Sequence, residues 1–149
     1  MNLRIPSVGI FFPVKGRKDV IIVHRATLVS TRNTDIAATA WGKLEVLSLD
    51  AFEQEGLQII TDSFKGFKDR EVREYTADVD QPEFASLSKS DKQRIKRGRL
   101  EVSASLRHNG DIWLTVPNTD YRVDINSATT NADFINGVKK LISIAKPVL

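Results

Sequence analysis

Cysteine is absent from this chain of 149 residues, and histidine occurs only twice. The absence of thiols excludes disulfides, thiolate metal sites and cysteine nucleophiles. His24 and His108 have no companion at a metal-binding spacing such as H-x-x-x-H. The sequence therefore predicts neither a metal centre nor a cofactor.

Catalytic signatures are missing as well. The chain contains no G-x-x-x-x-G-K-[ST] or G-x-G-x-x-G phosphate-binding motif and no G-x-S-x-G nucleophile elbow. Composition alone still permits a Ser/His/Asp triad assembled from distant residues. Nothing singles out one pair among the 19 acidic residues for glycoside chemistry. We therefore expect that the protein is not an enzyme.

Long hydrophobic runs are lacking too, since no apolar stretch approaches the ~18 residues that a membrane-spanning helix needs. The apolar run near the N-terminus is broken by Pro13 and followed by Lys15, Arg17 and Lys18, which is not the order of a signal peptide. With 41% hydrophobic and 28% charged residues, the composition is typical of a globular protein. We expect one domain over residues 1–149, located in the cytoplasm and not associated with a membrane.

An abrupt change of charge marks the middle of the chain. Six acids stand against two bases from Asp69 to Glu83, and six bases stand against one acid from Lys89 to Arg99. The net charge of +3 conceals this contrast. Such a polarised stretch favours a surface that meets a charged macromolecule.

The acidic segment has two interpretations. It is either a solvated connection or a patch that steers a basic protein toward this chain and raises the association rate. Under the second interpretation, the candidate partner-binding residues are Asp69, Glu71, Glu74, Asp78 and Asp80.

The basic segment is expected to form a short helix over Ser86–Gly98. This helix is either solvated or in contact with an acidic partner or with the chain's own acidic stretch. The phosphate backbone of a nucleic acid is a further candidate. However, no aromatic residue interleaves the bases, and the acidic segment beside them repels nucleic acid. Nucleic acid is therefore the less favoured partner.

Hydrophobic periodicity predicts strands at Ser7–Val14, Asp19–Arg25 and Trp41–Leu49. Four consecutive apolar residues in the second strand indicate burial on both of its faces. Asp50 is expected to cap the helix that follows, and Gly66 is expected to end it.

The C-terminal part predicts a further strand at Tyr121–Ile125 and a closing helix over Asn131–Ala145. Thr130 and Asp133 fit a capping box at the start of that helix. The whole pattern indicates an α+β fold. It consists of a mostly antiparallel sheet, a C-terminal hairpin or meander, and two to three helices packed against one face.

The clearest local pattern is an alternating stretch that ends at the Asn109–Gly110 turn and resumes as DIWLTVP. A two-residue loop would mix apolar and polar side chains on each face. A three-residue loop with the glycine left-handed sets Leu106 opposite Ile112 and leaves one face apolar. It also sets Arg107 opposite Asp111 as an ion pair beside the turn. We choose this second register because the core face decides the pairing.

This register places Trp113 on the polar face of the hairpin, close to Arg107. A tryptophan that a rigid strand presents beside an arginine is a good interface anchor. Trp113 and Arg107 are therefore candidate partner-binding residues. The alternative is that another element of the fold covers this face.

Four segments taken together resemble bacterial contact-dependent growth inhibition immunity proteins of a small α+β type: VIIVHRATLVSTRNT, KLEVLSLDAFEQEGLQIITDSF, DIWLTVPN and DYRVDIN. The similarity covers most of the chain and lies in the order of elements and the apolar pattern. Members of that family are not enzymes. Each binds the toxic C-terminal domain of its cognate delivery protein, often a nuclease, and blocks the active site or a nearby surface.

The resemblance implies an immunity protein that neutralises its cognate toxin domain by stoichiometric occlusion, and it supplies no contact residues. The alternative function, drawn from the residues themselves, is a nucleic-acid-binding accessory domain that uses the basic helix 89–99.

Overall fold

The structure is a computed structural model, and it describes residues 2–30, 36–68, 88–107 and 109–146. Six strands and three helices lie within these residues. Their bounds are β1 Asn2–Pro13, β2 Asp19–Ser30, β3 Ile36–Ser48, α1 Leu49–Lys68, α2 Lys89–Lys96, β4 Arg99–Leu106, β5 Ile112–Thr115, β6 Arg122–Ile125 and α3 Asn131–Ala145.

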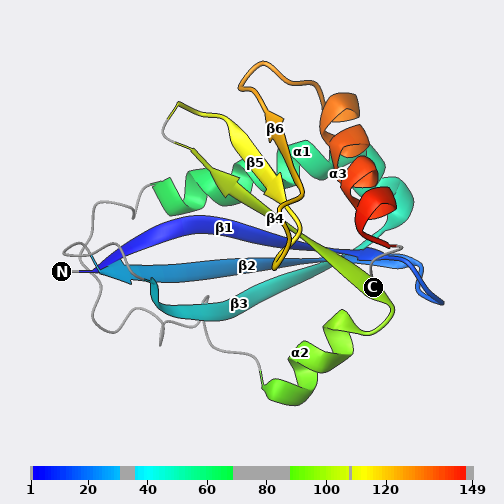
Figure 1. The fold of residues 1–149 in the computed structure, drawn as a ribbon, viewed down its shortest axis with the longest axis horizontal. Coiled ribbons are helices and arrows are strands. Elements are labelled where there is room, and N and C mark those ends of the chain that lie inside the picture. Colours follow the sequence, from blue (N-terminus) through cyan, green and yellow to red (C-terminus); the bar gives the residue numbers. More distant parts are fainter. Residues whose placement is uncertain (1, 31–35, 69–87, 108, 147–149) are drawn as a thin grey trace.

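The strands form one antiparallel sheet in the order β3-β2-β1-β4-β5-β6. Helices α1 and α3 pack on one face of this sheet, and α2 lies on the other (Figure 1). The predicted α+β fold with a mostly antiparallel sheet is confirmed. The expectation that all helices share one face is wrong for α2.

The position of α2 follows from the apolar run in β2. Val20 and Ile22 point into the core beneath α1 and α3, whereas Ile21 and Val23 point to the opposite face. There they are buried together with Phe11 of β1 and Ile95, the buried residue of α2. Burial of this stretch on both faces is therefore confirmed, and α2 supplies the second cover.

Helix α1 begins and ends differently from the prediction. The hydroxyl of Ser48 accepts a hydrogen bond from the Ala51 amide at 3.1 Å, so Ser48 caps the helix and Asp50 lies in its first turn. Gly66 lies inside the helix, which continues to Lys68. Asp50 still complements the positive end of the helix dipole.

The predicted hairpin register is confirmed, with Leu106 paired to Ile112 and Gly110 left-handed at φ 88°. The Arg107 amide donates to the Asp111 carbonyl at 2.8 Å. The prediction of an ion pair between the Arg107 and Asp111 side chains is wrong. The Asp111 carboxylate accepts from the Asn109 side-chain amide at 3.0 Å, and the Arg107 guanidinium lies over Trp113.

Helix α3 has the predicted bounds and the predicted cap. The Thr130 hydroxyl accepts from the Asp133 amide at 3.3 Å and donates to the Asp133 carboxylate at 3.0 Å. The rings of Phe52 and Phe134 meet between α1 and α3 with centroids 6.4 Å apart. The two helices approach closely at Gly56, where a Cβ atom would lie 2.9 Å from Ile135.

A side chain from α3 forms hydrogen bonds with two backbone groups of α1. Asn131 donates its amide to the Glu53 carbonyl at 2.6 Å and accepts from the Leu57 amide at 3.0 Å. In a regular α-helix, that amide donates to that carbonyl. Asn131 thus bridges a pair of backbone groups that would otherwise bond to each other.

Candidate functional site

Trp113 stands at the centre of an aromatic and cationic cluster on the face opposite α1 and α3. Strand β5 presents its half-buried ring, which pairs in register with Ser105 of β4 and Asp124 of β6. The Cζ atom of Arg107 lies 3.6 Å from the ring centroid, and that of Arg122 lies 4.1 Å from it. We call Trp113, Arg107 and Arg122 the Trp113 cluster.

The cluster has a rigid base and a polar surround. Arg122 also pairs with the Asp124 carboxylate at 2.9 Å, which fixes its guanidinium beside the ring. Half-buried Ser105 and Thr115 flank the tryptophan on the same face. Each guanidinium–ring contact contributes about 0.5–1 kcal/mol at an exposed site. The arrangement can bury an apolar ring in a partner and direct guanidinium donors to its carboxylates.

Helix α2 covers one part of this sheet face, and the Trp113 cluster lies on another part. Helix α2 packs through Ile95 on Phe11, Ile21 and Val23, which belong to β1 and β2. Among the described elements, α2 alone packs on this side of the sheet, and it leaves the face around Trp113 partly exposed. The interpretation of Trp113 as a surface residue of the sheet is thus favoured over that of a core residue.

The sequence placed two of the three cluster residues correctly. Arg107 and Trp113 were expected on one face, and the structure brings them into contact. Arg122 was missed, although the alternation of Tyr121–Ile125 places it on the polar face of the next strand. The pairing of Thr115 with Arg122 brings its side chain to the tryptophan. The five acidic candidates Asp69, Glu71, Glu74, Asp78 and Asp80 lie outside the described residues, so their role stays a prediction.

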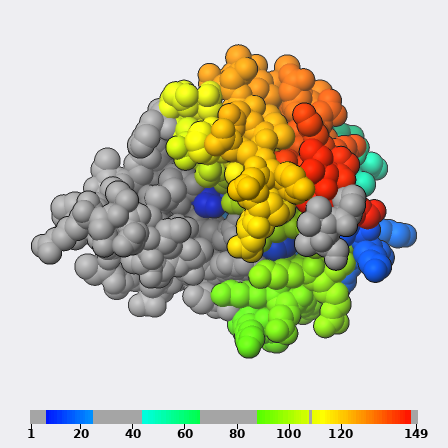
Figure 2. Space-filling model, in the orientation of Figure 1, coloured from blue at the N-terminus to red at the C-terminus, as the bar shows by residue number. Residues whose placement is uncertain are grey.

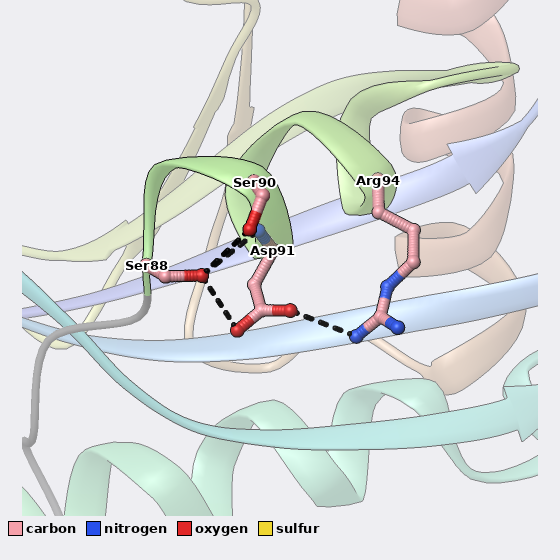
Figure 3. Close-up of polar contacts among 4 residues, drawn as sticks. All are labelled: Ser88, Ser90, Asp91 and Arg94. Carbon is pink, nitrogen blue, oxygen red and sulfur yellow. Dashed lines mark hydrogen bonds and ion pairs between the residues drawn. The ribbon is translucent and has the colours of Figure 1, made fainter.

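The basic segment divides between α2 and β4. Ser88 caps α2 by accepting from the Asp91 amide at 3.1 Å, and its hydroxyl donates to the Asp91 carboxylate at 2.8 Å (Figure 3). The same carboxylate pairs with Arg94 at 3.1 Å. The helix is shorter than the predicted Ser86–Gly98: it ends at Lys96, and Arg97 is its extended C-cap. Gly98 follows with φ 72°, and Arg99 belongs to the next strand. Asp91 therefore compensates part of the positive charge of α2.

A second polar cluster, which sequence reasoning missed, joins α1 to the sheet. The ring nitrogens of His24 lie 2.7 Å from the Ser63 hydroxyl and 2.9 Å from the Glu45 carboxylate. The His24 side chain is 13% exposed, and that of Glu45 is 36% exposed. An ionised carboxylate can only accept, so a neutral ring donates to Glu45 and accepts from the serine.

The order serine, imidazole and carboxylate is that of a hydrolase triad. Acyl transfer also needs free donors for an oxyanion. The amides of Ser63 and Phe64 lie inside α1, where each is committed to a helix hydrogen bond. Ser63, His24 and Glu45 join α1, β2 and β3, and we call these three residues the polar clamp.

Two further observations bear on the class of site. The residues that the structure describes include no group of three or more histidine, cysteine or acidic side chains close enough to hold a metal ion. Within the same residues, no helix combines the length and apolar character that crossing a membrane requires.

Comparison with protein-family models, curated proteins and solved structures found no match to this chain.

Proposed function

We propose that this chain is a non-enzymatic immunity protein that binds and neutralises a cognate toxin domain of a contact-dependent growth inhibition system in the cytoplasm. The observation that supports binding is the Trp113 cluster. A half-buried tryptophan between two guanidiniums, on the part of a sheet face that α2 does not cover, is typical of a protein-interface hot spot. The toxin as partner comes from the resemblance of the four sequence segments to that family.

The proposed mechanism is occlusion. The six-stranded sheet holds Trp113 in a fixed position, so little side-chain freedom is lost on binding. The ring displaces water from the toxin surface, and Arg107 and Arg122 pair with carboxylates around it. A one-to-one complex that covers the active site then stops the toxin without any chemical step.

Trp113→Ala tests this proposal. Calorimetric titration measures binding to the C-terminal domain encoded by the gene immediately upstream, at physiological salt. We expect nanomolar, one-to-one binding by the unchanged chain and an affinity loss on the order of 2 kcal/mol, or about 30-fold, for the variant. Trp113→Phe is the matched control, because it keeps an aromatic face for both guanidiniums and is expected to lose less.

Equilibrium unfolding in urea separates binding from folding. A Trp113→Ala chain that is folded and binds as before contradicts the role of the cluster. If that variant does not fold, Arg107→Gln and Arg122→Gln test the same surface, since both side chains are exposed. Absence of binding by the unchanged chain contradicts the immunity function itself.

A second candidate function is nucleic-acid binding by the basic helix. The observation that favours it is the contact of this segment with the basic β1–β2 turn, where Arg17 donates to the Arg97 carbonyl at 3.2 Å. The expected signature is duplex affinity that falls steeply with salt. Neutralising Lys92, Arg94 and Lys96 together is expected to flatten that dependence.

A further inference from the structure

A pocket of about 490 Å³ opens where the β1–β2 turn, the start of β4 and the end of α3 come together. Figure 2 shows the corresponding blue, green and red segments meeting at one end of the molecule. The lining residues are Val14, Lys15, Gly98, Arg99, Leu100 and Lys146. Among these described lining residues, three are cationic and none is acidic. The volume lies within the range of small-molecule sites.

The wall of the pocket is fixed by backbone contacts. The amides of Val14 and Lys15 donate to the Gly98 carbonyl at 3.0 and 3.2 Å. Left-handed Gly98 packs so closely on this turn that a Cβ atom would lie 2.5 Å from the Lys15 carbonyl oxygen. Two segments that are far apart in the sequence thus form one rigid rim.

Arg99 is the least exposed of the three cations that line the pocket. It is half-buried, and its guanidinium donates to the Asp19 carbonyl at 3.0 Å and to the Ile95 carbonyl at 3.2 Å. Both acceptors are neutral, so these bonds orient the group without neutralising it. Burial, followed by the nearby Arg17, lowers the pKa of Arg99, while Asp19 raises it. A partly buried cation beside other cations is stabilised by a bound anion.

A smaller pocket of about 280 Å³ adjoins the first and shares Arg99 and Leu100 with it. Its lining includes the cation Lys96, the acid Glu101, and Pro117, Asn118 and Thr119 of the β5–β6 connection. Figure 2 shows this gold segment facing the green α2 segment. An anion at Arg99 therefore has room beside it for an organic body.

We propose that Lys15, Arg99 and Lys146 form a binding site for a phosphate group. Cationic side chains from three elements line the pocket. Guanidinium and ammonium donors together match the several oxygens of a phosphate group better than a single carboxylate. The phosphate comes either from a small organic phosphate or from a nucleic-acid backbone. This site lies apart from the Trp113 cluster and does not depend on the proposed immunity function.

The test is titration of the full chain with inorganic pyrophosphate, and separately with a single-stranded oligothymidylate, followed by amide chemical shifts in NMR. We expect saturable shifts at Lys15, Gly98 and Lys146. Lys15→Gln combined with Lys146→Gln is expected to weaken binding roughly tenfold or more. Arg99 is kept, because its bonds to two carbonyls hold the turn.

The matched control is Lys65→Gln combined with Lys140→Gln, two exposed lysines on α1 and α3 that do not line the pocket. It removes the same charge, so a general electrostatic effect lowers both affinities equally, and that result overturns the proposal. Pyrophosphate binding that only the pocket variant loses supports a small-phosphate site. Binding of the oligonucleotide alone, lost in the same variant, assigns the pocket to backbone phosphates. Unchanged binding of both probes by the pocket variant overturns the site.

Discussion

Gly98 shows how much one residue constrains this fold. It has a left-handed backbone with φ 72°, and it faces a backbone oxygen that cannot move independently of the turn. Gly16 has nearly the same conformation, with φ 69°, but open space lies where its side chain would be. The two glycines therefore separate the cost of backbone conformation from the cost of close packing.

Replacing each glycine by alanine gives a direct prediction. Gly16→Ala is expected to lower the free energy of unfolding by about 1 kcal/mol, the cost of a left-handed alanine. Gly98→Ala carries that cost and a clash with the Lys15 carbonyl, so a loss of more than about 2 kcal/mol is expected. Equilibrium urea denaturation measures both. Equal losses contradict the tight packing of α2 and β4 against the β1–β2 turn.

His24 shows, also at the residue scale, a contact that the sequence does not predict. Its apolar neighbours in β2 indicate a buried strand, and that is correct. Its partners Glu45 and Ser63 lie on β3 and α1, and no spacing along the chain links the three residues. Only the strand register and the packing of the helix bring them together. The contact among these three side chains could therefore not be predicted from the sequence.

At the scale of elements, the hairpin and α3 were predictable because local signals agree. The alternation, the left-handed Gly110 and the apolar face all require one register, and the spacing of Thr130 and Asp133 fits the capping box that starts α3. At the start of α1, Ser48 and Asp50 are both good caps. Pairing of Ser48 with Asp19 extends β3 to that residue, so tertiary structure makes the choice.

The apolar run of β2 already indicated that a helix must pack on the second face of the sheet. A strand buried on both faces needs a cover on each, and β2 has that pattern. For the candidate site, the register was sufficient to join Arg107 to Trp113. Arg122 required the pairing of β5 with β6, which the sequence did not specify beyond an alternating strand.

The bridge from α3 into α1 gives the second prediction. Asn131→Ala lets the Leu57 amide return to the Glu53 carbonyl, so a loss of about 1 kcal/mol in unfolding free energy is expected. Asn131→Asp sets a carboxylate against that carbonyl. A loss of about 2 kcal/mol is expected, although the helix dipole favours an acid at this position.

Asn136→Asp, at an exposed position of the same helix, is the control for the chemical change alone. Urea denaturation of the three variants ranks them. An Asn131→Asp chain as stable as the control contradicts the bridging role of the side chain.

At the scale of the whole molecule, cationic side chains form two separate groups. In the described part, Lys15, Arg17, Arg99 and Lys146 gather at the end formed by the β1–β2 turn and α3. The Trp113 cluster lies on β4 to β6. A partner that approaches the cluster therefore meets a field that depends on orientation, and such fields change association rates more than final affinities.

The third prediction concerns that field. Asp78→Lys combined with Asp80→Lys is expected to slow association with the toxin domain about tenfold at low salt and to reduce its salt dependence. Stopped-flow mixing measures the rate. Glu55→Lys combined with Asp120→Lys changes the net charge equally at exposed positions. Equal rates for the two double variants remove the special role of the acidic segment.

The central place of the first strand matters for how the chain is made. Strand β1 pairs with β2 on one side and with β4 on the other. The pairing of Pro13 with Arg99 therefore cannot form until β4 has been synthesised. At ribosomal speeds, the intervening chain takes on the order of ten seconds to emerge. During that time the nascent N-terminal half has an unpaired β1 edge and an uncovered apolar face. Such an edge invites pairing with other strands, so protection by chaperones during synthesis is expected to matter more for this protein than its finished sheet suggests.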